Sequence, residues 1–286
     1  MLNGIHFEKN IRIISDELHK NIGTVQQIWQ ALLDANADRN SLVVNLGGGV
    51  IGDMGGFAAA TYKRGIAFVQ IPTTLLAMVD ASVGGKLGID FGSIKNSVGV
   101  FGEPAHVFIA PIFLETLPER ILRSGIAEMI KHEAIAHEKP NFEIDDVPTL
   151  DAIRRSVQIK YDIVQQDPFE KNIRKFLNFG HTVGHAFESF FLATDTPLLH
   201  GEAVALGMSV EAKMAVAQGF LGQNEFLLLE NALKTKFQGV FIPHFLDIIN
   251  DKTFSKIMEN DKKNENDTIK YVALHGFGKP FLSSFQ

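Results

Sequence analysis

The sequence predicts two domains, an α/β domain with a mainly parallel sheet in residues 1–115 and a mostly α-helical domain in residues 116–286. In the first part, short runs of β-branched residues alternate with helical segments, which is typical of a parallel sheet. Beyond Pro118 the periodicity is helical, and strand-like sequence returns only at residues 269–274. A chain of 286 residues with 45% hydrophobic residues can bury two such cores.

The composition excludes several kinds of site and partner. The chain has no cysteine, so any zinc must be held by nitrogen and oxygen ligands. No apolar run is long enough for a membrane span, and the first residues lack the pattern of a signal peptide. A net charge of −6 disfavours a nucleic-acid surface. We therefore expect a cytoplasmic protein that binds neither nucleic acid nor membrane.

The elements of the first domain follow from their residue patterns. Residues 11–15 are predicted as a short strand and residues 24–35, with apolar positions at helical intervals, as a helix. Residues 41–46 form a continuous apolar run that suits a buried parallel strand, and a helix is expected after it to about residue 62. Further strands are expected at residues 66–71 and 106–111.

A glycine-rich turn, Gly47 to Asp53, lies between the second predicted strand and its helix. Glycines let a backbone approach a pyrophosphate closely, and a helix N-terminus offers free N–H groups. The usual dinucleotide motif also expects an acidic residue roughly 20 positions further on. Nothing acidic lies between Asp53 and Asp80. A variant dinucleotide site and a simple tight turn are both compatible with this pattern.

Further motifs follow in both domains. Gly84-Gly85-Lys86 suggests a second contact to an anion, and Lys95-Asn96 follows it. In the second domain, residues 140–148 are expected to form a loop. Residues 259–267 are expected to form a charged, solvated loop that contains Lys262 and Lys263.

Three of the ten histidines fall within residues 181–200. At helical spacing, His181, His185 and Glu188 share one face, and His200 follows in the next segment. Imidazoles held by separate rigid elements can converge on one cation. The alternative interpretation is that they are ordinary histidines at helix ends.

Glu128 and Lys131 are three residues apart and share a face of a predicted helix. Such a pair is usually an exposed ion pair of little consequence. The apolar neighbours of this pair argue for burial, where an unpaired charge would be costly. Glu128, His181 and His200 together would provide one carboxylate and two imidazoles, the ligand count of a catalytic zinc site.

Taken together, these motifs resemble the 3-dehydroquinate synthase family of sugar-phosphate cyclases, from about Glu17 to Gly278. The resemblance implies an N-terminal nucleotide-binding α/β domain and a helical C-terminal metal- and substrate-binding domain, with NAD and Zn²⁺ or Co²⁺ in the cleft between them. It implies conversion of the seven-carbon keto-sugar phosphate DAHP to 3-dehydroquinate and phosphate, in the shikimate route to aromatic amino acids. The motifs that carry it are residues 47–53, 72–86, 95–96, 127–131, 177–185 and 200–204.

Matched motif by motif, the resemblance implies roles for individual residues. The metal ligands would be Glu128, His181 and His200, and His185 would contact the substrate, unlike in the interpretation from spacing alone. The other substrate contacts would be Asp80, Lys86, Asn96, Lys131, Lys160, Arg174 and Asn178, with Arg64 reaching the substrate phosphate across the interface of a homodimer. The NAD contacts would be Gly48, Gly49, Val50, Asp53, Thr73, Thr74 and Lys86. Lys95 would lie near the nicotinamide, and Glu17 and Lys20 are candidate ribose contacts. Lys262 or Lys263 would lie close to the substrate phosphate.

The chain departs from the family pattern in three places. The family usually has another βα unit before the region of Glu17, the segment 132–159 is short, and Leu87 stands where threonine is usual. Either the sequence omits residues or the protein is a truncated relative. The competing functions are a 2-deoxy-scyllo-inosose synthase-like cyclase, a metal-dependent polyol dehydrogenase of the same fold, and a non-enzymatic binding remnant.

Overall fold

The computed structural model describes residues 8–92, 94–192, 194–241, 248, 251, 254, 256–258 and 269–284. The chain divides into two compact units, residues 1–115 and 116–286, which we describe separately. The expected loop 259–267, with Lys262 and Lys263, lies outside the described residues.

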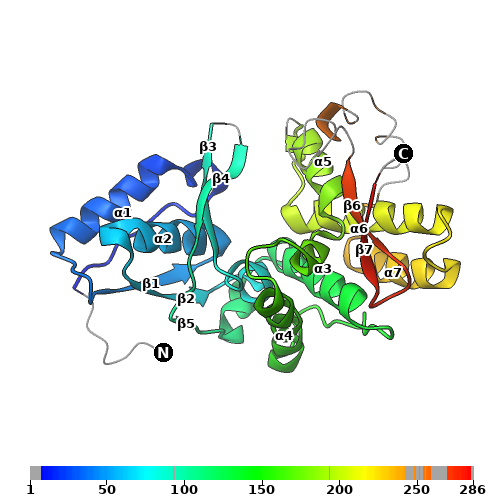
Figure 1. Ribbon diagram of the computed structural model, residues 1–286, viewed down its shortest axis with the longest axis horizontal. Helices are drawn as coiled ribbons and strands as arrows, with labels where there is room; N and C mark the ends of the chain where they lie inside the picture. The colour runs from blue at the N-terminus through cyan, green and yellow to red at the C-terminus, as the bar shows by residue number, and fades with distance from the viewer. Residues whose placement is uncertain are drawn as a thin grey trace. The chain divides into compact units, whose positions relative to one another are not determined.

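The first unit is an α/β unit (Figure 1). Its parallel sheet has the strand order β1-β2-β5, and the register pairs Leu42 with Ala67 through Gly47 with Pro72. This sheet confirms the predicted fold class. The elements in chain order are a 3-10 helix (Glu17–His19), α1 (Ile22–Asp34), β1 (Leu42–Gly47), α2 (Gly49–Thr61), a 3-10 turn (Tyr62–Arg64), β2 (Ala67–Pro72), a π-helical turn (Ala77–Ala81), β3 (Lys86–Phe91), β4 (Ile94–Phe101), β5 (His106–Val107) and a 3-10 helix (Pro111–Thr116).

Two strand predictions in this unit need correction. Residues 11–15 form no strand, because no strand among the described residues pairs with them, and only Ile13 packs on the core. The strand expected at 106–111 is only two residues long. Pro111 has no backbone N–H to donate to a neighbouring strand, and it begins a 3-10 helix. The sequence also gave no sign of the antiparallel hairpin formed by β3 and β4.

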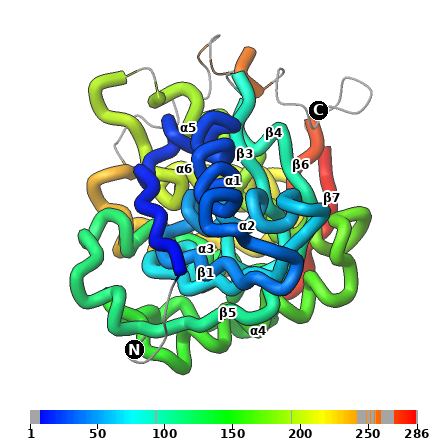
Figure 2. Tube along the Cα trace, turned by 90° about the vertical axis from the view of Figure 1, so that its left-hand side faces the viewer, coloured from blue at the N-terminus to red at the C-terminus, as the bar shows by residue number. Residues whose placement is uncertain are grey.

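Helix α2 forms the centre of the first unit. It contacts β1 and β2 of the parallel sheet as well as β3 and α1 (Figures 1 and 2). Its glycines permit this close packing: a Cβ on Gly55 would lie 2.0 Å from Oδ1 of Asn45, and one on Gly56 would lie 2.5 Å from Cδ2 of Leu87. The middle of α2 therefore packs closely against Asn45 of β1 and Leu87 of β3.

The second unit is mostly helical, as predicted. Helices α3 and α6 are buried along most of their length, which is expected for helices in the middle of a bundle. Its elements are α3 (Glu119–Ala136), α4 (Leu150–Gln166), a 3-10 helix (Ile173–Asn178), α5 (His181–Leu192), α6 (His200–Ala217), α7 (Gln223–Lys236), β6 (Lys270–Leu274) and β7 (Pro280–Ser284). The antiparallel pairing of β6 with β7 was not predicted, whereas the loop at residues 140–148 is as expected.

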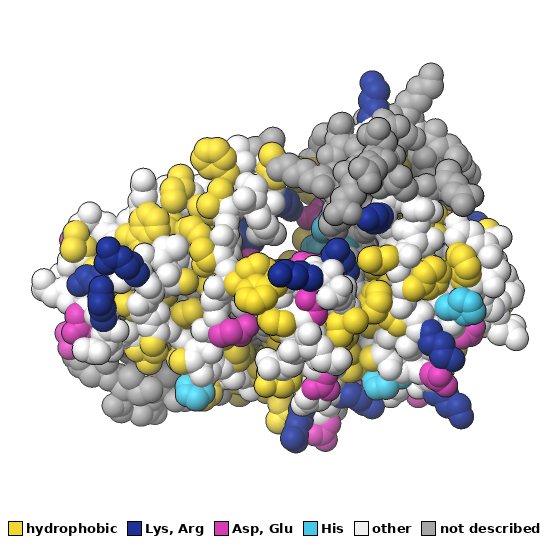
Figure 3. Space-filling model, in the orientation of Figure 1, with side chains coloured by type: hydrophobic (Ala, Val, Ile, Leu, Met, Phe, Trp, Pro, Cys, Tyr) yellow, Lys and Arg dark blue, Asp and Glu magenta, His cyan; other side chains and the backbone are white. Residues whose placement is uncertain are grey.

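The visible face of the protein carries acidic and basic side chains scattered among uncharged and apolar ones (Figure 3). None of the described helices combines the length and the apolar character needed to cross a bilayer.

Candidate active site

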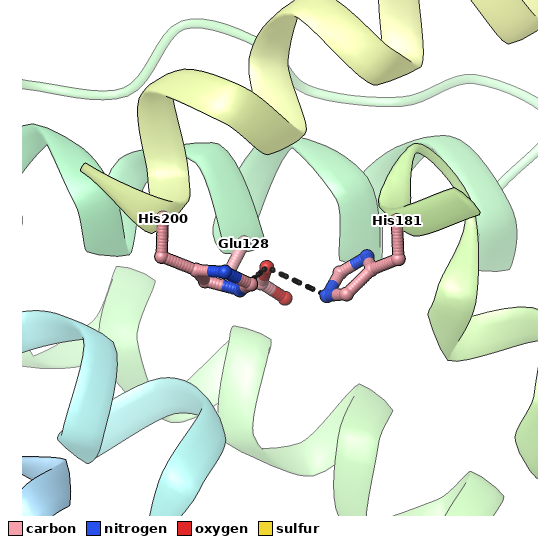
Figure 4. Close-up of side chains that lie close together, drawn as sticks. All are labelled: Glu128, His181 and His200. Carbon is pink, nitrogen blue, oxygen red and sulfur yellow. Dashed lines mark ion pairs between the residues drawn. The ribbon is translucent and has the colours of Figure 1, made fainter. Parts of the chain in front are cut away.

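Three predicted metal ligands from three different helices converge in the second unit (Figure 4). Oε1 of Glu128, in the middle of α3, lies 3.6 Å from Nε2 of His181 and 4.0 Å from Nε2 of His200. His181 is the first residue of α5, and His200 is the first residue of α6. One potential ligand atom from each residue lies within 4.8 Å of those of the other two.

The spacing of these atoms suits a divalent cation. Ligand bonds of about 2.0–2.2 Å in a tetrahedral site place neighbouring ligand atoms roughly 3.5 Å apart. Glu128 is fully buried, and its Oε1 atom accepts no hydrogen bond within the described part of the chain. A buried carboxylate oxygen needs a partner, and a cation between the three side chains would supply it. The residues therefore fit Zn²⁺ or Co²⁺, both of which accept nitrogen and oxygen ligands.

The other nitrogen of each imidazole is held in place. Nδ1 of His181 lies 3.2 Å from the backbone oxygen of Phe179, and Nδ1 of His200 lies 3.3 Å from Oε2 of Glu188. A hydrogen bond at Nδ1 fixes the ring and leaves the Nε2 lone pair for a metal. Both rings present Nε2 to Glu128.

Glycines bring α5 and α6 close enough to form this cluster. Gly180 has a φ of +78°. A Cβ atom on Gly207 would lie only 2.0 Å from the backbone oxygen of Gly180. A Cβ on Gly184 would lie 3.0 Å from the backbone oxygen of Ala203. Larger residues would therefore push the two helices apart, together with the histidines at their starts.

His185 also belongs to the histidine cluster, as the spacing predicted. Its ring centroid lies 5.5 Å from that of His181 and 6.0 Å from that of His200. His185, Glu188 and His200 form a second group with metal-ligand spacing. These two groups share His200. Of the two, only the first contains the buried carboxylate of Glu128.

Lys131 forms a buried ion pair with Glu128, through Nζ and Oε2. The interpretation of these residues as an exposed pair is therefore wrong. Two other expected substrate contacts in this unit, Lys160 and Arg174, are also buried, at 7% and 2% exposure. Buried cations are costly unless anions accompany them.

The loop that precedes α5 is organised by a residue that the sequence analysis missed. Asp167 accepts backbone hydrogen bonds from Lys171 at 2.9 Å, Asn172 at 2.6 Å and Arg174 at 3.1 Å. Burial acts to raise the pKa of Asp167, but these donors outweigh it and the pKa lies below its usual range. In the same loop, Nδ2 of Asn178 donates to Oε1 of Glu170 at 2.8 Å. The only sign in the sequence that could have pointed to Asp167 and Glu170 is their position a few residues before the Arg174 motif.

The expected nucleotide contacts lie in the first unit, around the start of α2. Gly48 is the N-cap residue of α2, and no side chain caps the helix there. A Cβ on Gly48 would lie 3.1 Å from Cγ2 of Thr74, and Thr73 donates its N–H to the oxygen of Gly47 at 2.9 Å. The turns after β1 and β2 therefore adjoin each other. Free N–H groups at the carboxyl end of a parallel sheet can receive a pyrophosphate.

Lys20 joins several of the expected contacts in this unit. Its Nζ donates to Oδ2 of Asp53 and to Oδ1 of Asn96, both at 2.6 Å. Lys95 lies 4.0 Å from Glu17. Burial raises the pKa of Asp53, an effect that the Lys20 ammonium opposes. The structure thus brings together an expected ribose contact, a glycine-turn carboxylate and an expected substrate contact.

Three further expected residues lie in other elements of the first unit. Asp80 is in the π-helical turn, and Lys86 is exposed at the start of β3. Arg64, with a φ of +70°, is exposed beyond the far end of α2. At 1.5 Å per residue, the length of α2 places Arg64 roughly 20 Å from the glycine turn.

Comparison with known proteins identifies the family of this chain. The N-terminal family profile of 3-dehydroquinate synthase matches residues 10–124, and the C-terminal profile matches residues 125–264. The 3-dehydroquinate synthase of Parabacteroides distasonis is 43% identical over 92% of this chain and 75% of its own length.

Solved structures of related cyclases are also similar. A 2-deoxy-scyllo-inosose synthase complexed with carbaglucose-6-phosphate, NAD⁺ and Co²⁺ has a TM-score of 0.84 at 27% identity, covering 96% of this chain and 79% of that one. The 2-epi-5-epi-valiolone synthase of Streptomyces hygroscopicus, with NAD⁺ and Zn²⁺ bound, has a TM-score of 0.81 at 27% identity, covering 96% and 78%. The matched profiles span both units, and the chain therefore belongs to the 3-dehydroquinate synthase family.

Proposed function

We propose that this protein catalyses the 3-dehydroquinate synthase reaction, which converts DAHP to 3-dehydroquinate and inorganic phosphate. The observation that carries this proposal is the 43% identity to a 3-dehydroquinate synthase over 92% of the chain. The similar cyclases of known structure, which close other rings, are only 27% identical. Ring chemistry depends on the site residues, and the greater identity favours the DAHP reaction over theirs.

We propose NAD as the nucleotide cofactor, held by the glycine turn at the start of α2. The nucleotide would supply reversible hydride chemistry at the carbon that bears a substrate hydroxyl, so NAD would not be consumed. Gly48 and Gly49 allow the pyrophosphate to approach the backbone, and Thr73 and Thr74 lie beside them. The Lys20–Asp53 pair lies in the same unit and would hold the ribose hydroxyls.

We propose Glu128, His181 and His200 as the ligands of a Zn²⁺ or Co²⁺ ion. The metal would act as a Lewis acid on substrate oxygens and orient adjacent hydroxyls. The three ligand side chains come from three rigid helices, which keep their ligand atoms in place before the metal or substrate binds. Lys131, paired with Glu128, would orient that carboxylate and donate a hydrogen bond to the substrate.

The buried cations of the second unit suit a substrate that carries a phosphate and a carboxylate. Lys160 and Arg174 are expected to bind these anionic groups, and Asn178 and His185 are expected to position hydroxyls. Arginine can hold such groups with two parallel hydrogen bonds. The loop that Asp167 organises fixes the backbone of Arg174.

Product analysis with purified protein tests this function. Incubation with DAHP, a trace of NAD and Zn²⁺ should release one phosphate per DAHP and form 3-dehydroquinate, without steady accumulation of NADH. Glucose 6-phosphate in place of DAHP is the control for the other cyclase reaction. Stoichiometric NADH formation would instead indicate a dehydrogenase, and turnover of glucose 6-phosphate alone would indicate a 2-deoxy-scyllo-inosose synthase-like enzyme.

We also propose a homodimer in which Arg64 of one subunit reaches the substrate phosphate of the other. Its exposed position at the far end of α2 from the glycine turn supports a role outside its own subunit. Arg64→Ala should raise the KM for DAHP much more than that for NAD. Mixing Arg64→Ala with the inactive His181→Ala variant should restore part of the activity, because one site of the mixed dimer has both residues. Equal losses of NAD and DAHP binding would contradict this role.

A further inference from the structure

The two histidines proposed as metal ligands each occupy the first position of a helix, His181 in α5 and His200 in α6. The start of a helix carries unpaired backbone N–H groups and a partial positive charge. That charge opposes a divalent cation nearby. Each of these helix starts therefore needs acceptors for its N–H groups and, beside a metal, negative charge.

Helix α6 meets this need with its own residue. Glu202, in its first turn, accepts the N–H of the N-cap residue Leu199 at 2.8 Å. Arg120 of α3 holds the same carboxylate through two hydrogen bonds of 2.7 Å. The start of α6, and His200 with it, is thus capped by a local glutamate.

Helix α5 has no such residue, because Gly180 stands at its N-cap position and Val183 stands where Glu202 stands in α6. The carboxylate comes instead from Glu211, near the middle of α6. Its Oε2 accepts the N–H of Gly180 at 2.7 Å, and its Oε1 accepts the N–H of Val183 at 3.2 Å. These are the two N–H groups that a local capping box would satisfy.

Glu211 is fully buried, in a part of α6 whose residues are nearly all buried. Placing a carboxylate there is costly unless hydrogen bonds compensate it. The two N–H groups on either side of His181 provide that compensation. The contact also links the start of α5 to α6, so it fixes His181 relative to the helix that begins with His200.

We propose that Glu211 is a positioning residue of the metal centre. It caps α5 from the neighbouring helix, holds His181 with Nε2 directed at Glu128, and supplies negative charge that offsets the helix dipole beside the cation. This inference rests on the proposed metal site and extends it, since Glu211 is not itself a ligand.

The experiment compares Zn²⁺ affinity, by competition with a chelator in the absence of substrate, for the wild type, Glu211→Gln and Glu211→Asp. Glutamine keeps the size and one acceptor oxygen but removes the charge, and aspartate keeps the charge. We expect Glu211→Gln to weaken Zn²⁺ binding about 10- to 100-fold and to alter the visible absorption of the Co²⁺-loaded protein. Glu211→Asp should recover part of the affinity.

Glu225→Gln is the matched control. Glu225 accepts the backbone N–H groups of Gly222 at 3.0 Å and Phe277 at 3.1 Å, at the start of α7. Its loss removes a comparable cap away from the histidines, so stability should fall while Zn²⁺ affinity stays unchanged. Wild-type affinity and an unaltered Co²⁺ spectrum in folded Glu211→Gln would overturn the inference, as would an equal loss of affinity in Glu225→Gln.

The outcome is separable from the proposed reaction, because metal binding is measured without DAHP. If the wild type binds Zn²⁺ but does not convert DAHP, the proposed function fails and the role of Glu211 is still decided by the variants. If the wild type binds no Zn²⁺, the metal centre and the role of Glu211 are both overturned.

Discussion

Gly201 of α6 lies directly against Ser124 of α3, so that a Cβ atom on Gly201 would come within 2.3 Å of the Cα atom of Ser124. Glu128 follows Ser124 by four residues, about one turn of α3, and His200 immediately precedes Gly201. This contact between backbones allows Oε1 of Glu128 and Nε2 of His200 to stand 4.0 Å apart. The spacing of these two ligand atoms is therefore set by packing between residues that are not themselves ligands.

Gly201→Ala should separate the two helices, because backbone atoms of Ser124 cannot move away as a flexible side chain could. We expect a loss of about 1–3 kcal/mol in the free energy of unfolding and weaker Zn²⁺ binding. Urea denaturation and chelator competition measure the two effects. Gly239→Ala is the control, since a Cβ there would meet no atom within 4 Å. Unchanged Zn²⁺ affinity in Gly201→Ala would show that the helix spacing does not matter to the metal.

The two groups that share His200 make different predictions for the histidines. His181→Ala and His200→Ala should be purified with little zinc and almost no activity, because each loses a ligand. His185→Ala should keep nearly stoichiometric zinc but turn over slowly, having lost a group that positions the substrate. Metal analysis of the three variants decides between the sets. Loss of zinc from His185→Ala together with retention in His181→Ala would favour the group of His185, Glu188 and His200.

Removal of the Lys20 ammonium should leave the Asp53 carboxylate without its charged partner. Lys20→Met is expected to cost about 3 kcal/mol at neutral pH, as for other broken buried pairs, and to weaken NAD binding. The pKa of Asp53 is already raised by burial and should rise further. A carboxyl whose folded-state pKa is raised destabilises the protein increasingly as pH rises above its unfolded value of about 4.

Urea denaturation at several pH values measures this effect. The deficit of Lys20→Met should be larger at pH 8 than at pH 4.5, and it should be nearly independent of pH in Lys20→Met/Asp53→Asn. An equal deficit at both pH values in Lys20→Met alone would show that the loss comes from packing of the lysine chain and not from the charge.

Asp167 should make the free energy of unfolding change with pH in the opposite direction, so that its contribution to stability grows as pH rises. Its three backbone donors hold the pKa below the usual range, so its contribution is fully present above the unfolded pKa and is lost as pH falls through the folded one. Asp167→Asn should be less stable than the wild type at pH 7, and the difference should shrink toward pH 3. It should also raise the KM for DAHP through Arg174 without releasing zinc. Asp162→Asn, in the exposed last turns of α4, is the control and should match the wild type.

Local patterns in the sequence predicted much of this protein. Alternation of apolar runs with helical segments predicted the parallel pairing of β1 with β2, and the glycines after β1 indicated the start of α2. Composition limited the metal ligands to nitrogen and oxygen donors. The motifs also identified the family, because each is short and is read without knowing what it contacts. These properties depend on neighbours within one or two turns, which a sequence displays directly.

Tertiary structure decided what lies far apart in the chain. Helical spacing indicated His181 and His185 as partners, but the packing of both α3 and α5 against α6 brings the buried Glu128 to His181 and His200. The caps of Glu211 on α5 join residues 28 and 31 positions apart, and no local motif marks them. Hydrogen bonds of this kind depend on how closely α5 and α6 approach. That distance is set by glycine contacts such as Gly207 with Gly180, which become visible only when both helices are packed.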